Sequence, residues 1–258
     1  MYLGIDLGTS CVKIIILDEH DQLVAQASSP LEVSRPAPLW SEQAPADWWQ
    51  ATHLAMDELL QNHSVVLQAV KAIGLSGQMH GATLLDDTNN IIRPAILWND
   101  GRSEAQCQWL ESIEPNSRAI TGNIAMPGFT APKLVWLKEN EPDNFAKIAK
   151  VLLPKDYLRF LMTGDYASDM SDSAGTLWLD VEKRAWSQAM LTASSLTEAQ
   201  MPTLYEGTEI TGMLHSELAK KWGIPAVPVI AGGGDNAAGA AGIGVINPNE
   251  AFLSLGTS

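Results

Sequence analysis

The chain has 258 residues, 46% hydrophobic and 18% charged, which is typical of a globular protein large enough to bury a sizeable core. It carries 16 basic and 30 acidic side chains, and the resulting net charge of −14 disfavours non-specific binding to nucleic acid. It has neither an apolar run of about 18 residues nor a basic N-terminal segment followed by a long apolar one, so we expect no membrane span and no signal peptide.

The first predicted element is a β-hairpin over residues 2–17. Its turn is Gly-Thr-Ser at 8–10, the strand before the turn carries Asp6, and the strand after it carries Lys13. Backbone N–H groups, two hydroxyls, a cation and a carboxylate would then face one point, as a polyphosphate with Mg²⁺ requires. An ordinary turn has similar residues. The end of the chain repeats the corner, however, with Leu-Gly-Thr-Ser at 255–258.

The next segments predict a strand, a loop and a helix. The strand covers Leu23–Ser28, and four prolines over 29–45 predict a surface loop. The helix begins at Pro45 and continues with apolar residues at helical spacing. Trp48 and Trp49 could form a platform for a sugar ring, but tryptophan at this spacing is more typical of a core.

Two predicted strand ends carry polar and aromatic side chains. A strand over 70–75 runs into Ser-Gly-Gln-Met-His-Gly, and a strand over 95–98 ends in Trp98 and runs into Asn-Asp-Gly-Arg at 99–102. Polar groups just beyond strand ends are where α/β proteins usually bind ligands. His80 alone would more often be a structural histidine, but the two strand ends together indicate a ligand cleft.

The middle of the chain predicts helices separated by loops. The segment 167–178 is rich in Ser, Asp and Gly. Asp169 and Asp172 could be metal ligands, but turn and cap roles explain such residues more simply. The predicted helices cover residues 103–112, 131–140 and 154–163, with short ones at 186–191 and 216–222.

A glycine-rich segment precedes the last predicted helix. A strand over 227–231 leads into three glycines at 232–234, and Asp235-Asn236 opens a helix of Ala and Gly at 237–242. Such small residues indicate that a backbone or a ligand passes close by. Asp235 could simply be the N-cap of this helix. A cap does not need three preceding glycines, whereas a carboxylate that a substrate can reach is suited to take a proton.

Five stretches are specific when they occur together: GIDLGTS at 4–10, GLSGQMHG at 74–81, AILWNDGR at 95–102, MPGFT at 126–130 and GGGDN at 232–236. On these stretches the chain resembles the N-terminal part of the FGGY family of carbohydrate kinases. The Gln-Met-His-Gly stretch resembles the members that act on xylulose rather than those that act on glycerol. The resemblance spans all 258 residues but only one of the family's two domains.

The resemblance implies an α/β fold of the actin-like, ribonuclease-H-like type, with a mixed sheet, antiparallel N-terminal hairpins and flanking helices. Residues 1–246 would form the sugar-binding domain. Residues 247–258 would be the first strand and turn of a nucleotide-binding domain. We therefore expect the chain to be part of a longer two-domain kinase and to be inactive alone.

The resemblance also implies roles for individual residues. Asp235 would remove the proton of the D-xylulose 5-hydroxyl, ATP would supply the phosphoryl group, and Asp6 would act in catalysis by holding Mg²⁺ through water. The sugar pocket would be lined by Met79, His80, Trp98, Asp235 and Asn236. The phosphates would face Gly8, Thr9, Ser10, Lys13, Gly256 and Thr257.

Two positions depart from the family pattern. Cys11 stands where a smaller or hydroxyl-bearing residue is common, which does not affect the chemistry. Gly128 stands where glycerol kinases have a substrate tyrosine, which indicates a different and larger substrate.

Other functions stay open at this point. One is a kinase for another pentulose or for gluconate. Another is an actin- or chaperone-type ATPase module, which shares the first hairpin but has no use for the stretches at 78–80 and 234–236. The expected partners are a sugar and ATP, with no nucleic acid and no membrane, and a homodimer stays open. The two cysteines, Cys11 and Cys107, suit a reducing cytoplasm.

Overall fold

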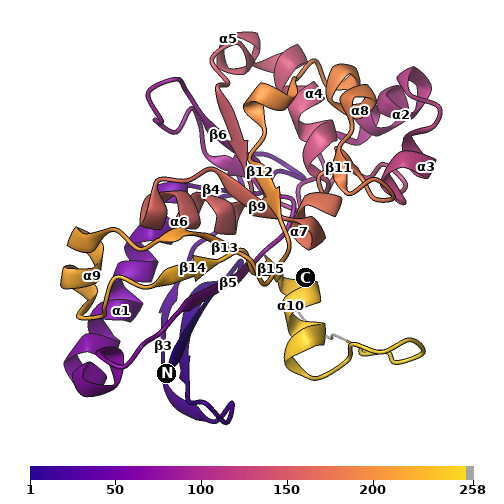
Figure 1. The fold of residues 1–258 in the computed structure, drawn as a ribbon. Coiled ribbons are helices and arrows are strands. Elements are labelled where there is room, and N and C mark those ends of the chain that lie inside the picture. The colour runs from indigo at the N-terminus through magenta and orange to yellow at the C-terminus, as the bar shows by residue number, and fades with distance from the viewer. Residues whose placement is uncertain (254–258) are drawn as a thin grey trace.

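The computed structural model describes residues 1–253. Its main feature is a seven-stranded mixed sheet of order β13-β14-β5-β1-β2-β3, with β15 paired to β5 (Figure 1). The strands are β1 (Tyr2–Leu7), β2 (Cys11–Leu17), β3 (Leu23–Pro30), β5 (Ile73–Gly77), β13 (Ile210–Met213), β14 (Pro228–Ile230) and β15 (Gly233–Gly234).

The predicted hairpin forms, and it gives the sheet two different faces. β1 and β2 are antiparallel, whereas β1 and β5 are parallel. Side chains alternate along each strand, so Leu3, Ile5 and Leu7 are buried on one face. Asp6 and Lys13 are register partners on the other face. The groups expected to meet a phosphate therefore lie on the face opposite the core.

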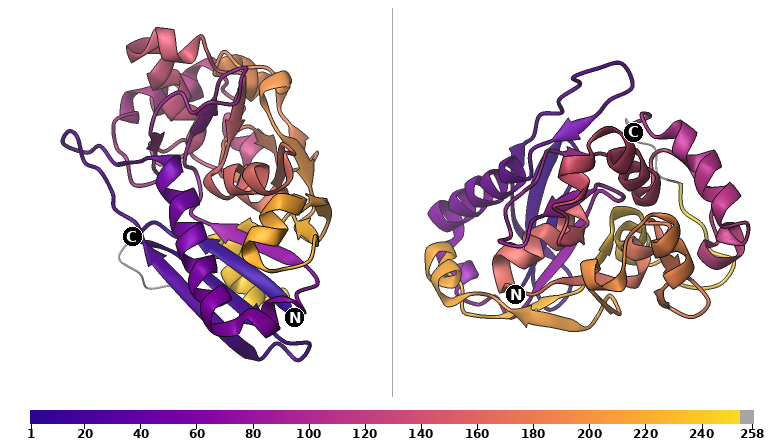
Figure 2. Two further views of the ribbon diagram at one scale, coloured as in Figure 1. Left: turned by 90° about the vertical axis from the view of Figure 1, so that its left-hand side faces the viewer. Right: turned by 90° about the horizontal axis from the view of Figure 1, so that it is seen from above.

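Helices α1 (Pro45–Leu67) and α6 (Pro154–Thr163) cover the buried face, and α9 (Ser216–Trp222) packs beside α1 (Figure 2). Proline begins both α1 and α6, as predicted, because its fixed φ suits the first helical turn. Gly164 ends α6 with a φ of +81°. Trp48 is fully buried in this core, which confirms its predicted core role.

A second layer of short elements lies beside the sheet, at the upper right in Figure 1, around its own hydrophobic core. Its helices are α2 (Glu104–Ile113), α3 (Ser117–Thr121), α4 (Thr130–Asn140), α5 (Pro142–Phe145), α7 (Met170–Ala174), α8 (Gln188–Ala193) and the 3₁₀ helix Glu198–Gln200. Its two-stranded sheets pair β4 (Glu42–Gln43) with β7 (Ala95–Ile96), β6 (Thr83–Leu85) with β8 (Lys150–Leu152), β9 (Ala167–Asp169) with β12 (Thr203–Tyr205), and β10 (Leu179–Asp180) with β11 (Ala185–Trp186).

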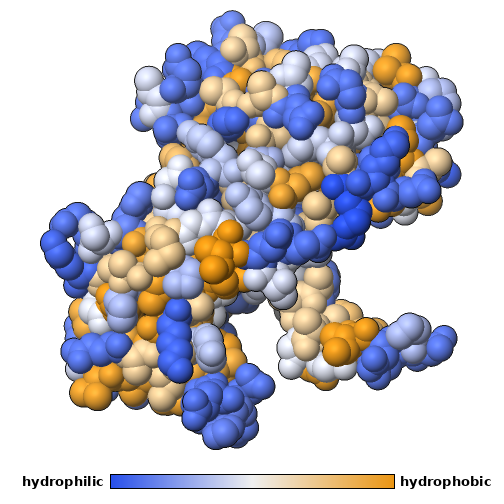
Figure 3. All heavy atoms as spheres, in the orientation of Figure 1, coloured by the Kyte–Doolittle hydropathy of each residue, from blue (hydrophilic) through white to orange (hydrophobic). Residues whose placement is uncertain are grey.

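The described chain ends in helix α10 (Asp235–Gly242) and the segment after it. The helix begins at Asp235, as predicted, and stands apart from the rest of the molecule (Figure 1). A hollow of about 710 Å³ lies between α10 and the open face of the sheet, visible as a notch in Figure 3. Within residues 1–253, no helix has the length and apolar character needed to cross a membrane.

Candidate active site

Three parallel strands end side by side at one edge of the sheet. Their last residues, Leu7 of β1, Gly77 of β5 and Gly234 of β15, are register partners. The carboxyl ends of such strands are where α/β sheets usually bind ligands. The residues that follow these three ends are Gly8, Gln78 and Asp235. The register therefore joins three stretches that the sequence places far apart.

The hairpin turn offers unpaired backbone donors at this edge. The Gly8 N–H closes the hairpin on the Cys11 carbonyl at 3.0 Å, and a Cβ at Gly8 would lie only 3.1 Å from that oxygen. The N–H groups of Thr9 and Ser10 have no acceptor among the described residues. Successive free N–H groups in a turn form an anion-binding concavity.

The Thr9 hydroxyl is engaged within the protein. It accepts a hydrogen bond from Trp98 Nε1 at 3.0 Å and donates one to Gln78 Oε1 at 3.4 Å. The structure thus joins the turn to Trp98, at the end of the strand predicted over residues 95–98. Of the two turn hydroxyls, only that of the exposed Ser10 has no partner within residues 1–253.

Asp6 and Lys13 face the hollow below α10. Asp6 Oδ1 accepts a hydrogen bond of 2.5 Å from Ser76, and Oδ2 accepts none from the described residues. No carboxylate of residues 1–253 lies within 4.0 Å of Lys13 Nζ. The same residues contain no cluster of three or more metal-ligating side chains. An ion held here would rely on the single Asp6 carboxylate, with water or substrate completing its shell.

The His80 loop is fixed by a buried lysine that the sequence pattern did not reveal. His80 has a φ of +67°, an uncommon conformation for a residue other than glycine. Its carbonyl accepts hydrogen bonds from Thr130 Oγ1 at 3.1 Å and from Lys133 Nζ at 2.9 Å. Lys133 also donates to the Gly128 carbonyl at 2.7 Å, and burial lowers its pKa to about 7. Nothing in the local pattern distinguishes this lysine from a surface one.

The ring of His80 is held as one neutral tautomer. Its Nδ1 lies 2.7 Å from the Gly175 carbonyl, and a carbonyl oxygen can only accept, so Nδ1 carries the proton. Burial lowers the His80 pKa to about 4, and the charge of Lys133 acts in the same direction. The ring therefore stays neutral at pH 7 and leaves Nε2 as an acceptor for a hydroxyl.

The loop that carries Gly128 lies against Trp98. A Cβ at Gly128 would lie 2.5 Å from the Trp98 carbonyl oxygen, so any side chain here forces the backbone to move. Four residues after Trp98, Arg102 forms ion pairs of 2.7 Å with both Glu42 and Asp100. Its guanidinium lies 3.7 Å from the Trp40 ring centroid. These contacts hold the segment after Trp98 in place.

Asp235 lies in the first turn of α10, and Gly234 is the N-cap. Asp235 is therefore the first helical residue rather than the N-cap, and its carboxylate accepts a hydrogen bond of 2.8 Å from the Asn236 N–H. Its side chain is exposed, yet partial desolvation raises its pKa, the Asp6 charge adds to this, and the Asn236 N–H opposes it. Met79 lies below, since a Cβ at Gly234 would be 2.9 Å from Met79 Cγ.

A second feature missed from the sequence is a buried glutamine network behind the turn. Gln43 donates to the Thr9 carbonyl at 2.8 Å. Its side-chain oxygen accepts from Trp48 Nε1 and Gln78 Nε2, each at 2.9 Å. The network links the turn to the core helix and to the strand end before Met79.

The remaining predicted residues have different outcomes. Asn236 lies beside Asp235 with an exposed side chain, whereas Trp49 lies away from this edge, against His53 and Trp222. Asp169 is the N-cap of α7, as expected, but Asp172, also expected in a turn or cap, is instead buried beside Lys155. The expectations for Gly256 and Thr257 lie outside the described residues.

Comparison with known proteins identifies the family of this chain. Residues 1–242 match the FGGY family of carbohydrate kinases, N-terminal domain. The chain is 63% identical over its whole length to the xylulose kinase of Escherichia coli (strain K12) and 57% identical to that of Klebsiella pneumoniae. It covers 53% of each, so it spans about half the length of these relatives.

Comparison with a solved structure identifies the fold. The crystal structure of a "xyloylose kinase" from Brucella ovis matches with a TM-score of 0.97 at 56% identity, over 99% of this chain and 53% of that one. The fold is therefore the actin-like, ribonuclease-H-like fold of the sugar kinases. By its sequence match and its fold, the chain belongs to the FGGY family of carbohydrate kinases.

Proposed function

We propose that this chain provides the sugar-binding part of a kinase that transfers the γ-phosphoryl group of ATP to the 5-hydroxyl of D-xylulose. The observation that carries the proposal is the register of β1, β5 and β15, which places the hairpin turn, the His80 loop and Asp235 at one edge. The names of the relatives support the choice of sugar. In this proposal, residues 1–246 form the sugar-binding domain and residues 247–258 begin the nucleotide-binding domain.

The proposed sugar pocket uses the groups around Gly234. The neutral His80 ring accepts a hydrogen bond from a sugar hydroxyl at Nε2, while Met79 and Trp98 provide apolar surface and Asn236 provides an amide. Asp235 takes the proton of the attacking hydroxyl. Its raised pKa makes the carboxylate a stronger base than an ordinary aspartate. The oxygen freed of its proton then attacks the γ-phosphorus in line.

The proposed phosphate site is the turn with its flanking strands. The free N–H groups of Thr9 and Ser10 and the ammonium of Lys13 would hold the phosphates. Asp6 fits a Mg²⁺ held partly through water, because one of its oxygens accepts no hydrogen bond from residues 1–253 and Mg²⁺ usually takes one or two carboxylates plus phosphates and waters. When bound, this ion neutralises charge on the phosphates.

The decisive experiment replaces the proposed base. We would join residues 1–258 to the remaining half of the Escherichia coli relative and measure ADP formation with D-xylulose, D-ribulose, gluconate and glycerol. We expect turnover that depends on D-xylulose. Asp235→Asn should lower kcat about 10²–10⁴-fold, the usual contribution of a general base, while sugar affinity changes little.

Two controls make the result specific. Asp165→Asn removes a carboxylate away from the strand ends and should leave kcat unchanged. The 258-residue chain alone should bind the sugar without turning over ATP. Near-normal kcat in the Asp235→Asn variant would exclude Asp235 as the base, and turnover without added sugar would favour a simple ATPase instead.

A further inference from the structure

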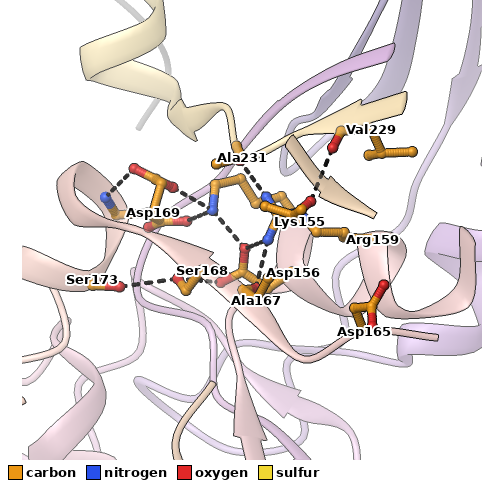
Figure 4. Close-up of polar contacts among 12 residues, drawn as sticks. Lys155, Asp156, Arg159, Asp165, Ala167, Ser168, Asp169, Ser173, Val229 and Ala231 are labelled. Atoms are coloured by element: carbon orange, nitrogen blue, oxygen red, sulfur yellow. Dashed lines mark hydrogen bonds and ion pairs between the residues drawn. The ribbon is translucent and has the colours of Figure 1, made fainter. Parts of the chain in front are cut away.

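A buried ionic cluster lies behind the glycine loop, and nothing in the proposed chemistry uses it. It contains three residues of α6 and two of the α7 region, namely Lys155, Asp156, Arg159, Asp169 and Asp172. Each of their side chains is at most 1% exposed. Figure 4 shows Lys155 between the carboxylates of Asp156 and Asp169. Burying so many charges is costly unless each is paired, so the arrangement calls for an explanation.

The cluster is connected to the loop that carries Asp235. Lys155 Nζ lies 2.6 Å from Asp169 Oδ1. The other oxygen of Asp169 accepts hydrogen bonds from the Ser171 N–H at 2.8 Å and the Ser171 hydroxyl at 2.5 Å. Because Ser171 donates its only hydroxyl proton to Asp169, its oxygen can accept, and it does so from the Gly234 N–H at 3.2 Å. Gly234 directly precedes Asp235.

Two further contacts support the same loop. Arg159 Nη2 donates to the carbonyl of Ala231, the residue before the three glycines (Figure 4). At the far end of α7, the Gly175 carbonyl accepts the His80 Nδ1 proton at 2.7 Å. Helix α7 therefore touches the loops of both His80 and Asp235. Three consecutive glycines have little stiffness of their own, so their position depends on such contacts.

We propose that the contact chain Lys155–Asp169–Ser171 positions Gly234, and through it the carboxylate of Asp235, for proton removal. In this proposal Lys155, Asp169 and Ser171 are positioning residues that act through Asp235. The direction of each hydrogen bond follows from the charge of Lys155, which fixes Asp169 as an acceptor and Ser171 as its donor. This proposal rests on the proposed function, because it assigns the purpose of the cluster to Asp235.

Ser171→Ala is the sharpest test, because it breaks the chain of contacts without leaving a buried charge unpaired. Ser173→Ala is its matched control. Ser173 lies in the same helix and its hydroxyl donates to the Ser168 hydroxyl at 3.0 Å, but within residues 1–253 it makes no hydrogen bond to the glycine loop. Thermal melts followed by circular dichroism would verify that both variants are folded.

The first readout does not depend on activity. In the 258-residue chain, hydrogen exchange of the Gly234 amide should become about fivefold faster in Ser171→Ala, the size expected for losing one neutral hydrogen bond. It should not change in Ser173→Ala. Equal exchange rates in the two variants would overturn the contact chain, whatever the enzyme does.

The second readout tests the positioning role in the joined kinase. Ser171→Ala should lower kcat about tenfold and change KM for D-xylulose less than twofold, because misplacing a base affects the transition state more than sugar binding. A kcat within twofold of the unmodified protein, with faster Gly234 exchange, would overturn the positioning role. If Asp235→Asn keeps its activity, the proposed role of Asp235 as the base fails, while the exchange result still decides whether the contact chain exists.

Discussion

At the scale of single residues, burial decides which chemistry His80 can perform. The ring donates from Nδ1 to a backbone carbonyl, so its second nitrogen is available only while the ring is neutral. Desolvation and the nearby Lys133 together disfavour the charged form. The sequence predicts a histidine at a strand end but not its protonation state, because that state depends on Lys133, which lies 53 positions further along the chain.

This protonation state predicts how stability varies with pH. The His80 pKa falls from 6.5 in the unfolded chain to about 4 in the folded protein, so its contribution is complete above pH 6.5 and is lost as pH falls toward 4. The loss amounts to about 3 kcal/mol for this group. Urea unfolding of the protein and of His80→Gln at pH 7.5, 6.0 and 5.0 would isolate the contribution of His80 to the free energy of unfolding. Their stability difference should shrink at acid pH.

An NMR titration of the His80 ring provides an independent check of the same prediction. The ring should remain neutral, with the proton on Nδ1, down to about pH 5. A midpoint near 6.5 for His80 would contradict the assignment.

At the scale of elements, the sequence predicts helix boundaries where the signal is local. Pro45 and Pro154 begin helices, and Gly164 ends one, because each residue's own backbone preference decides the matter. Helix α7 was not predicted. It has five residues, and its N-cap Asp169 is held by Lys155 from another helix. Such a long-range ion pair leaves no trace in the local pattern.

The glutamine network is a second case in which elements depend on one another. Gln43 of β4 holds the Thr9 carbonyl, Trp48 of α1 and Gln78 after β5. Gln43→Met keeps the volume but leaves the buried Trp48 N–H without its acceptor. We expect the free energy of unfolding to fall by about 2–4 kcal/mol, since each unsatisfied buried group costs about 1–3 kcal/mol.

Urea unfolding would measure this change. Gln61→Met, on the exposed side of α1, is the matched control and should alter stability by less than about 0.5 kcal/mol. A Gln43→Met variant as stable as this control would mean that the network does not support the turn.

At the scale of the whole molecule, the candidate site lies where the two hydrophobic cores meet. One core lies under the hairpin and contains Leu7 and Trp48, and the other lies beneath the His80 loop and contains Leu134 and Trp178. The resemblance predicted the fold class, and the strand register brings three of its stretches together at one edge of the sheet. The resemblance could not predict Lys133, Gln43 or the ionic cluster, because their roles arise only from packing between the cores.

This arrangement predicts that sugar binding stabilises the entire chain. A ligand that bridges the Asp235 loop on the sheet and the His80 loop beside the second core binds only when both are formed. At 100 times its Kd, such a ligand adds about 2.7 kcal/mol, which raises the Tm of a protein of this size by about 5–11 °C. D-xylulose should produce this shift in the 258-residue chain, whereas glycerol, which has fewer hydroxyls to bond to the two loops, should produce almost none. His80→Ala should abolish the shift, and Asp235→Asn should keep most of it, because the asparagine side chain retains an acceptor.

Two outcomes would contradict this prediction. An equal shift with gluconate would mean that the pocket does not select D-xylulose. No shift with D-xylulose, D-ribulose, gluconate or glycerol would mean that the pocket needs residues beyond those of this chain.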